Sequence, residues 1–203
     1  MNHPPSPAMP LDIGFIGLGV MGAPMAGHLA RAGHRLTVLD ADAGLARQVA
    51  SSLGAVAVAT PAEVAARSGI VITMLPDGQV VQQVALGEKG LVQGLRPGAL
   101  LLDTSSAEPW LTQATATALS ECGATMVDAP VSGAAWGAAE ANLVFMVGGA
   151  PDDLERVRPL LDRMGRAVFH LGGVGAGHAM KCLNNLITAM TFSATAEGLV
   201  IGK

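Results

Sequence analysis

A lysine and an amide near the end of the chain have the types and spacing to carry chemistry. Lys181 and Asn185 lie four residues apart in the segment 175–185, which reads Gly-Ala-Gly-His-Ala-Met-Lys-Cys-Leu-Asn-Asn. The two glycines predict a turn and the rest predicts a helix, so both side chains would share one helical face. An amine beside an amide can move a proton and orient a small polar substrate. The competing interpretation is an amphipathic helix with a solvated lysine, because most lysines lie on protein surfaces.

A glycine-rich turn near the other end predicts a nucleotide-binding site. The sequence Gly-Leu-Gly-Val-Met-Gly follows an apolar run and precedes a helical stretch. The first glycine allows the tight turn, the second lets a pyrophosphate approach the backbone, and the third lets the helix pack against the strand. The helix would add free N–H groups and the positive end of its dipole. We therefore expect this turn to bind a dinucleotide through Gly17, Leu18, Gly19, Val20, Met21 and Gly22.

Asp40 indicates which dinucleotide binds. It ends the second strand-like run, 18 residues after Gly22, where a carboxylate can bond both ribose hydroxyls of the adenosine half and repel a 2′-phosphate. Arg35 and Arg47 are near in sequence, but no arginine directly follows Asp40. The sequence thus predicts NAD, with NADP disfavoured. A lysine acid/base together with NAD indicates hydride transfer.

Composition limits the class of partner. The chain has 203 residues, of which 50% are apolar and 14% charged, with a formal net charge of −4 and no basic run. This balance argues against nucleic acid and anionic membranes as partners. No apolar run approaches the roughly 18 residues that a membrane helix needs. We expect a cytoplasmic protein.

Cysteines and histidines predict no metal site. Cys122 and Cys182 fit neither a disulfide framework nor a metal-ligand spacing. The five histidines form no ligand pair of the HxxxH type, and we interpret them as caps, surface residues or residues at the core edge: His3, His28, His34, His170 and His178. We assign no metal.

The order of apolar runs predicts a doubly wound α/β fold with a mostly parallel, Rossmann-type sheet. Continuous apolar runs without alternation are typical of strands buried on both faces. Stretches such as 23–32, 62–66 and 109–121 predict crossover helices between them. The expected strands are 13–16, 36–39, 55–58, 70–74, 99–102, 125–127, 144–147 and 167–169.

Three parts are expected along the chain. Residues 1–10 contain four prolines and no lysine or arginine, which predicts a disordered tail rather than a signal peptide. Residues 11–172 are expected to form the NAD-binding Rossmann domain. Residues 173–203 follow a glycine-rich hinge and predict a long helix, the incomplete start of a second, all-helical domain. Because this helix is apolar, we expect protein beyond residue 203 or another subunit to bury it.

Four motifs in one order resemble those of the 3-hydroxyisobutyrate dehydrogenase-like, or β-hydroxyacid dehydrogenase, family, which includes tartronate semialdehyde reductases. They are residues 14–22 followed by 32–34 and a strand ending in Asp40; 103–109; 128–133 running on to 146–149; and 175–185. Together they extend over residues 13–203. The resemblance implies the same Rossmann fold and NAD-dependent chemistry.

The resemblance also implies roles for particular positions. Lys181 matches the catalytic lysine, and Asn185 matches the amide that positions the substrate. A useful base needs the pKa of its amine lowered by burial or by a cationic neighbour. The positions that match contacts to the cofactor are Leu75, Pro76 and Ser106.

Ser132 and Gly133 match the family's site for the substrate carboxylate. We expect a short helix over 134–140 to follow them, and its free N–H groups with the serine hydroxyl could hold a small carboxylate. The structural alternative is that Ser132 only caps this helix.

The sequence departs from the family pattern in three residues and in length. Ala134 and Ala141 replace frequent glycines, and the bulky Trp136 lies in the same loop, so the substrate pocket could differ. Family members continue into a helical domain that closes the active site, adds a cofactor-contacting lysine and makes much of the dimer contact. A homodimer or homotetramer is therefore expected for the full-length form.

The expected function is that of an NAD-dependent oxidoreductase acting on a CH–OH group. It would interconvert a small 3-hydroxy acid, of the 3-hydroxyisobutyrate or tartronate semialdehyde/glycerate type, and its semialdehyde. One alternative is a catalytically incomplete NAD-binding fragment. Another is a 6-phosphogluconate dehydrogenase-like enzyme, although that family has His-Asn where this chain has Asn184-Asn185. A third is an imine reductase-like enzyme, a class that generally lacks the lysine.

Overall fold

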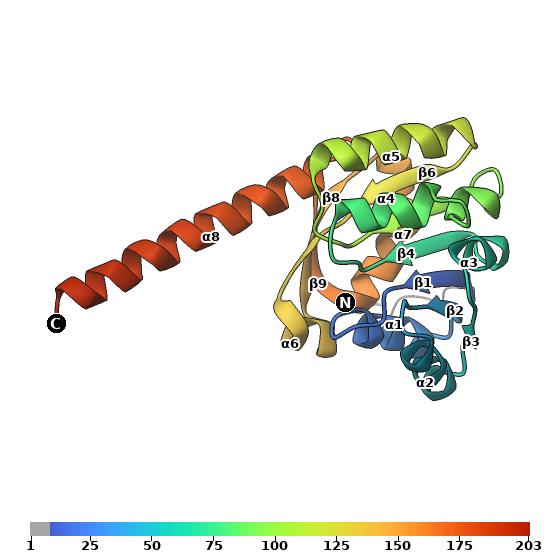
Figure 1. The fold of residues 1–203 in the computed structure, drawn as a ribbon, viewed down its shortest axis with the longest axis horizontal. Helices are drawn as coiled ribbons and strands as arrows, with labels where there is room; N and C mark the ends of the chain where they lie inside the picture. The colour runs from blue at the N-terminus through green and yellow to red at the C-terminus, as the bar shows by residue number, and fades with distance from the viewer. Residues whose placement is uncertain (1–8) are drawn as a thin grey trace, which may run out of the picture.

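Strand β1 (Asp12–Ile16) lies inside the sheet because its last four residues are buried and offer no polar face to water. The computed structural model describes residues 9–203, so the predicted tail lies mostly outside the described residues. Parallel neighbours flank β1 on both sides, β2 (Arg35–Leu39) and β4 (Ile70–Thr73). The strand order is β3-β2-β1-β4-β5-β6-β8-β7, with β9 paired to β8. The prediction of a doubly wound, mostly parallel sheet is confirmed (Figure 1).

Each of the eight expected strands has a counterpart in the structure. Besides β1, β2 and β4 they are β3 (Val56–Ala57), β5 (Leu100–Asp103), β6 (Thr125–Asp128), β8 (Leu143–Gly148) and β9 (Gly165–Gly172). Strand β7 (Val131–Ser132) was not expected, because two residues carry no periodicity. It pairs antiparallel with β8, where Ser132 lies opposite Val144. Strand β8 is also antiparallel to β6, and these are the exceptions to the parallel sheet.

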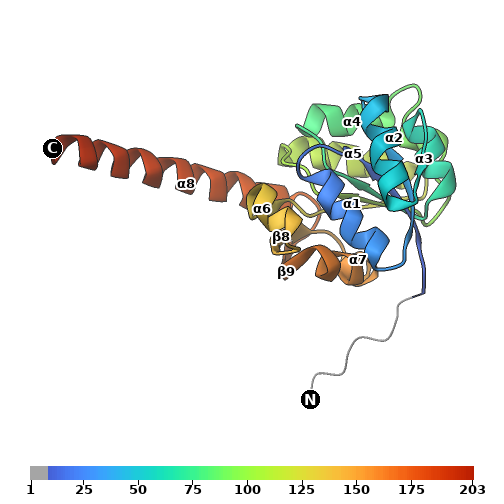
Figure 2. The ribbon, with the colours of Figure 1, turned by 90° about the horizontal axis from the view of Figure 1, so that it is seen from below.

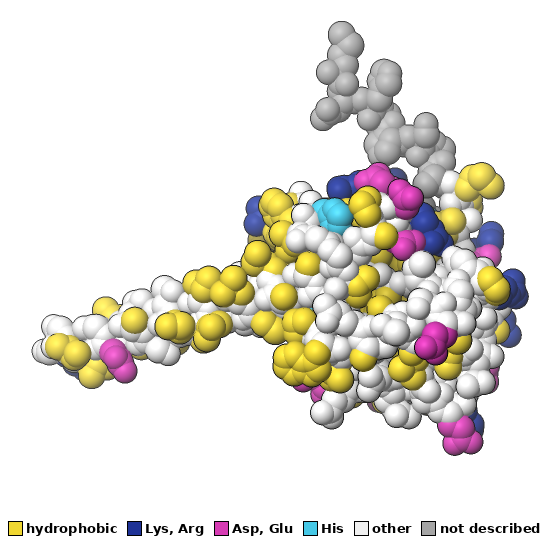
Figure 3. Space-filling model, turned by 90° about the horizontal axis from the view of Figure 1, so that it is seen from above, with side chains coloured by type: hydrophobic (Ala, Val, Ile, Leu, Met, Phe, Trp, Pro, Cys, Tyr) yellow, Lys and Arg dark blue, Asp and Glu magenta, His cyan; other side chains and the backbone are white. Residues whose placement is uncertain are grey.

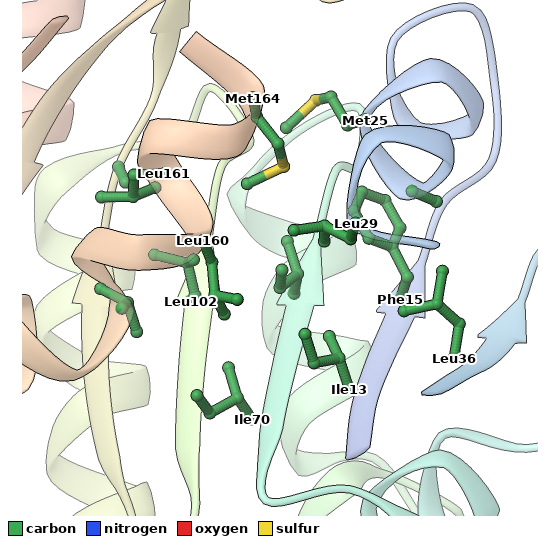
Figure 4. Close-up of a cluster of buried hydrophobic side chains, with 14 of the residues drawn as sticks. Ile13, Phe15, Met25, Leu29, Leu36, Ile70, Leu102, Leu160, Leu161 and Met164 are labelled. Atoms are coloured by element: carbon green, nitrogen blue, oxygen red, sulfur yellow. The ribbon is translucent and has the colours of Figure 1, made fainter. Parts of the chain in front are cut away.

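Helices cover both faces of the sheet and bury its apolar side chains. Helices α1 (Gly22–Arg31), α2 (Ala43–Leu53) and α7 (Pro151–Met164) share one buried cluster with strand residues such as Phe15 and Leu102. Figure 4 shows Met25 and Leu29 of α1 facing Met164 of α7 over these strands. The other face carries α3 (Pro61–Arg67), α4 (Gly78–Leu86) and α5 (Pro109–Glu121), packed in a second cluster. Two short helices complete the layers, η1 (Leu91–Gln93) and α6 (Ala134–Ala139).

Helix α8 (Ala176–Ile201) projects from the layered part as a long rod (Figure 1 and Figure 2). Within it only Gly177 and His178 are buried. Its exposed apolar side chains line the rod in Figure 3 and include Leu183, Leu186, Ile187, Met190, Phe192, Leu199, Val200 and Ile201. That further protein buries this helix stays a prediction. Within residues 9–203, no helix has the length and hydropathy to cross a membrane.

Candidate functional site

The glycine turn lies where the order of the parallel strands reverses. From β1 the chain passes to β2 on one side, and after β3 it returns to β4 on the other side of β1. Ligands of doubly wound folds bind in the crevice at this point, outside the carboxyl ends of the strands. A cleft of about 770 Å³ opens there. The predicted cofactor residues that line it are Gly17, Gly19, Val20, Met21, Gly22, Asp40, Leu75 and Pro76.

The three glycines of the turn have the geometry that their proposed roles require. Gly17 has a φ of 95°, and a Cβ there would collide with the carbonyl of Met74. A Cβ on Gly22 would collide with the carbonyl of Gly17, so the start of α1 could not approach the turn. At Gly19 a Cβ would meet no atom within 4 Å, so space is open on its cleft side. This cradle fits the pyrophosphate of a dinucleotide.

Asp40 both braces the turn and lines the cleft. Its carboxylate accepts hydrogen bonds from the N–H of Leu18 at 2.7 Å and from the N–H of Asp42 at 2.9 Å. Each carboxylate oxygen can accept a second bond, so two sites remain for ribose hydroxyls. Leu18 itself does not line the cleft: its side chain is 1% exposed within the core, and its N–H is bound to Asp40.

A second cavity, of about 440 Å³, gathers the residues predicted to act on the substrate. Met21 and Met74 line both cavities, so the two adjoin. All four residues predicted to act on the substrate line it: Ser132, Gly133, Lys181 and Asn185. Ser106, predicted to contact the cofactor, lines this cavity rather than the glycine-turn cleft, and Ala134 and Asn184 line it as well. They come from the loop after β5, from β7, from α6 and from α8. The fold thus brings together residues that are up to 79 positions apart, from Ser106 to Asn185.

The Lys181 amine is held at the edge of this cavity. Its Nζ donates a hydrogen bond to the carbonyl of Val131 at 2.7 Å. The side chain is half-buried, and this burial lowers the pKa of the Lys181 amine from its ordinary value of 10.5. A lowered pKa suits a lysine that must both take and give a proton near neutral pH.

Ser132 does not cap the helix that follows it. Helix α6 begins after Gly133, ends at Ala139 rather than at the expected Glu140, and has no side-chain capping bond. The Ser132 side chain is half-buried and lines the cavity. The capping alternative is therefore not supported by this geometry. With only six residues, α6 has a weak dipole, so a carboxylate at this place would depend more on the serine hydroxyl than on the helix end.

Ala134 and Ala141, which replace family glycines, keep the backbone conformation that favours glycine. Their φ angles are 52° and 54°, and no other non-glycine residue among positions 9–203 has a positive φ. This left-handed conformation costs an L-residue about 1–2 kcal/mol. Trp136 is 63% exposed and does not line the cavity, so Ala134 is the departure that touches the predicted substrate site.

The interpretation of His178 as a cap, surface or core-edge residue is wrong. Its side chain is fully buried and lies between the carboxylates of Asp103 and Asp128, each 3.7 Å from a ring nitrogen. The prediction failed because His178 follows a glycine turn, and local sequence does not show that this turn lies against the ends of two strands. A signal was present, since Asp103 and Asp128 both end apolar runs of a parallel sheet.

Other candidate groups stay outside this arrangement. Within residues 9–203, no cluster of three or more His, Cys, Asp or Glu side chains could hold a metal ion. Cys122 and Cys182 are free and exposed. Two glycines of the segment predicted to be a hinge are hydrogen-bonded to the sheet: Gly149 donates its N–H to the carbonyl of Gly172, and Gly175 donates its N–H to Asp128. That the segment acts as a hinge stays a prediction.

Comparison with known proteins agrees with this arrangement. The family model of the NAD binding domain of 6-phosphogluconate dehydrogenase matches residues 12–172. A 3-hydroxyisobutyrate dehydrogenase of Pseudomonas aeruginosa is 40% identical over 195 residues, which cover 94% of this chain and 64% of that protein. The 2-hydroxy-3-oxopropionate reductase of Escherichia coli is 41% identical over 193 residues, which cover 95% of this chain and 65% of that protein.

Solved structures show the same fold. The structure of Mycobacterium tuberculosis 3-hydroxyisobutyrate dehydrogenase, described with L-serine, superposes with a TM-score of 0.89 and 37% identity, covering 95% of this chain and 65% of that one. This chain therefore spans just under two thirds of the length of the relatives it matches.

Proposed function

Because this chain belongs to the family of the NAD-binding domain of 6-phosphogluconate dehydrogenase, with 3-hydroxyisobutyrate dehydrogenase-like proteins among its relatives, we propose that the full-length protein is an NAD-dependent oxidoreductase of small 3-hydroxy acids. It would oxidise a substrate of the 3-hydroxyisobutyrate or glycerate type to its semialdehyde, and reduce the semialdehyde in the reverse direction. The family membership supports the cofactor. The substrate and the reaction rest on the site.

One observation carries the proposal: the cavity that Lys181 and Asn185 line adjoins the dinucleotide cleft through Met21 and Met74. A substrate there would lie beside the nicotinamide end of a dinucleotide bound along the glycine turn. Bound NAD supplies the hydride acceptor in this chemistry. The protein has to supply placement and a route for the proton.

Each candidate site residue has a distinct task in this proposal. The glycine turn holds the pyrophosphate, and Asp40 accepts hydrogen bonds from ribose hydroxyls. The Ser132 hydroxyl binds the substrate carboxylate, while the Asn185 amide orients the reacting hydroxyl. Lys181 takes the hydroxyl proton during oxidation and returns it during reduction.

The lining of the cavity favours a small monocarboxylate. Among the described residues that line it, Lys181 is the one charged side chain. A phosphorylated sugar acid carries up to two more negative charges and needs further cations, typically arginine. The lining thus favours a 3-hydroxy acid over a 6-phosphogluconate-like substrate.

The assembly and location of the protein stay predictions. The exposed apolar rod of α8 supports burial by further chain or by a second subunit, as in a homodimer or homotetramer. It also supports a second candidate, in which residues 1–203 alone bind NAD but do not turn over substrate. A cytoplasmic location remains our expectation.

Calorimetric titration with NADH, and with NADPH in parallel, tests the cofactor part of the proposal. We expect micromolar binding of NADH and weaker binding of NADPH. Absence of binding to either nucleotide by protein with a folded circular dichroism spectrum would contradict the proposal.

Initial rates with NAD test the substrate part. The substrates are 3-hydroxyisobutyrate, D-glycerate and L-serine, with 6-phosphogluconate as the comparison. We expect reduction of NAD with at least one of the three small acids and none with 6-phosphogluconate. If the full-length protein oxidised only the phosphorylated acid, the proposed substrate class would be wrong. Binding without turnover by residues 1–203 would select the second candidate.

A further inference from the structure

The imidazole of His178 is enclosed by four polar groups at the junction of the sheet and α8. Its Nδ1 lies 2.7 Å from the Thr112 hydroxyl, and its Nε2 lies 3.1 Å from the carbonyl of Ser105. The carboxylates of Asp103 and Asp128 lie 3.7 Å from the ring nitrogens. A carbonyl oxygen only accepts, so Nε2 carries a hydrogen and donates to Ser105. Both ring nitrogens thus have hydrogen-bond partners, and a buried polar group paired in this way favours one arrangement of the elements that carry it.

Asp128, at the end of β6, holds the first turn of α8 through two hydrogen bonds. Its Oδ1 accepts the N–H of Gly175 at 2.7 Å, and its Oδ2 accepts the N–H of His178 at 2.8 Å. A carboxylate from the end of β6 therefore satisfies two N–H groups that the start of a helix leaves unpaired. Gly148 and Gly177 make this approach possible, because a Cβ on either would crowd the Asp128 carboxylate.

Asp103 extends the cluster to the neighbouring strands. Its Oδ1 accepts bonds from the Thr73 hydroxyl at 2.8 Å and from the N–H of Ser105 at 3.0 Å. Its Oδ2 is buried, has no hydrogen-bond partner and lies on the side of His178 Nε2. An unpaired buried carboxylate oxygen is costly, so the ring that faces it provides its nearest electrostatic compensation.

The cluster joins the two halves of the candidate site. Ser105 not only accepts from His178 through its carbonyl; its hydroxyl also accepts the N–H of Leu75 at 2.9 Å. Leu75 lines the dinucleotide cleft. On the other side, Lys181 follows His178 by three residues, so both lie on adjacent turns of one face of α8. A displaced His178 ring would therefore shift the Lys181 amine relative to Leu75 and the dinucleotide cleft.

We propose that His178 is a positioning residue that sets the place of Lys181 relative to the dinucleotide cleft by locking the first turn of α8 onto the ends of β5 and β6. The inference rests on the proposed function of Lys181. The contacts of the His178 side chain are independent of that function. His178 touches neither cavity. It acts through Asp128, Thr112 and Ser105, and its loss should misplace the lysine without removing any group from the cofactor cleft.

The test compares His178→Leu with His178→Gln in the full-length protein. Glutamine can donate to the Ser105 carbonyl and still hydrogen-bond the Thr112 hydroxyl, whereas leucine can do neither. His34→Leu is the matched control, because His34 is a nearly buried histidine at the amino end of β2, whereas His178 packs on the carboxyl ends of β5 and β6. Thr112→Val removes one hydrogen bond to the ring with little change of shape. It replaces His178→Leu as the test variant if His178→Leu does not fold.

Three readouts separate positioning from a general loss of structure. The first is the NADH dissociation constant, and the second is kcat with the best small hydroxy acid. The third is the pH dependence of trace acetylation of Lys181, measured by mass spectrometry, which reports the state of the amine without needing a substrate.

For His178→Leu we expect kcat to fall about tenfold to a hundredfold, since a small misplacement of a catalytic group has this effect. NADH affinity should stay within about twofold, and the acetylation midpoint should rise toward that of an ordinary lysine. His178→Gln should restore most of kcat, His34→Leu should match the wild type, and Thr112→Val should follow His178→Leu to a smaller extent.

The proposal is overturned if folded His178→Leu keeps the wild-type kcat and the wild-type acetylation midpoint. If His178→Leu does not fold, unchanged values in Thr112→Val overturn it instead. If the wild type oxidises none of the hydroxy acids, the proposed function has failed, yet the acetylation profiles still decide whether His178 positions Lys181.

Discussion

Lys181 donates a hydrogen bond from Nζ to the carbonyl of Val131, across 50 residues of sequence. This bond ties α8 to β7, the short strand that ends in Ser132. The amine is thereby bonded to the residue that directly precedes Ser132, whose hydroxyl is predicted to bind the substrate carboxylate.

Lys181→Ala should reduce turnover by about a hundredfold to ten-thousandfold, the usual contribution of a general acid or base. NADH binding should be nearly unchanged, because Lys181 lines only the second cavity. Steady-state rates and calorimetry measure the two effects separately. Lys203→Ala, an exposed lysine beyond the end of α8, is the control. A variant at position 181 that kept most of its rate would remove the lysine from the proton route.

The pH dependence of the two reaction directions should be opposite. Burial lowers the pKa of the Lys181 amine below 10.5. Oxidation needs the neutral amine as base, so kcat/KM for the hydroxy acid should rise as pH increases through this lowered pKa. Reduction needs the charged amine as acid, so kcat/KM for the semialdehyde should fall over the same range. A common midpoint at or above 10.5 would contradict the burial of the amine.

Asp40→Ala should lower the ratio of the NADPH to the NADH dissociation constant about tenfold or more. Hydrogen bonds to a charged group contribute about 1.5–3 kcal/mol, and the ribose bonds would be lost together with the repulsion of a 2′-phosphate. Calorimetric titration with both nucleotides gives the ratio. Asp42→Ala is the matched control, because Asp42 caps α2 and does not line the cleft. An unchanged ratio in Asp40→Ala would exclude Asp40 from cofactor selection.

Ala141→Gly should raise the free energy of unfolding by about 0.5–1 kcal/mol. The left-handed backbone at this position costs alanine about 1–2 kcal/mol, and the greater freedom of glycine in the unfolded chain cancels part of the gain. Urea unfolding curves measure the difference. Ala30→Gly, inside α1, should instead lower the free energy by about 1 kcal/mol. If both substitutions destabilised the protein equally, the strain at position 141 would not be real.

Much of the fold could be predicted from the sequence because its signals are local. Continuous apolar runs mark strands such as β4 and β5, whose residues are all buried. The glycines in the turn between β1 and α1 mark the crevice at the carboxyl end of β1. Strand β7 could not be predicted, since it exists only as a partner of β8. The alternative in which Ser132 only caps a helix is not supported for a similar reason, because the surroundings of Ser132 come from β8 and α8 and not from its sequence neighbours.

The sequence by itself determined the order of strands and helices, the glycine cradle, and the placing of Lys181 and Asn185 on one face of a helix, because these depend on spacings of a few residues. Only the tertiary structure decided the burial of His178, the bond from Lys181 to Val131 and the link from Leu75 through Ser105 to α8. Those contacts join residues 30 to 73 positions apart. They exist because the carboxyl ends of parallel strands meet at one edge of the sheet, and the register and packing that bring them together are not encoded in any single stretch of the chain.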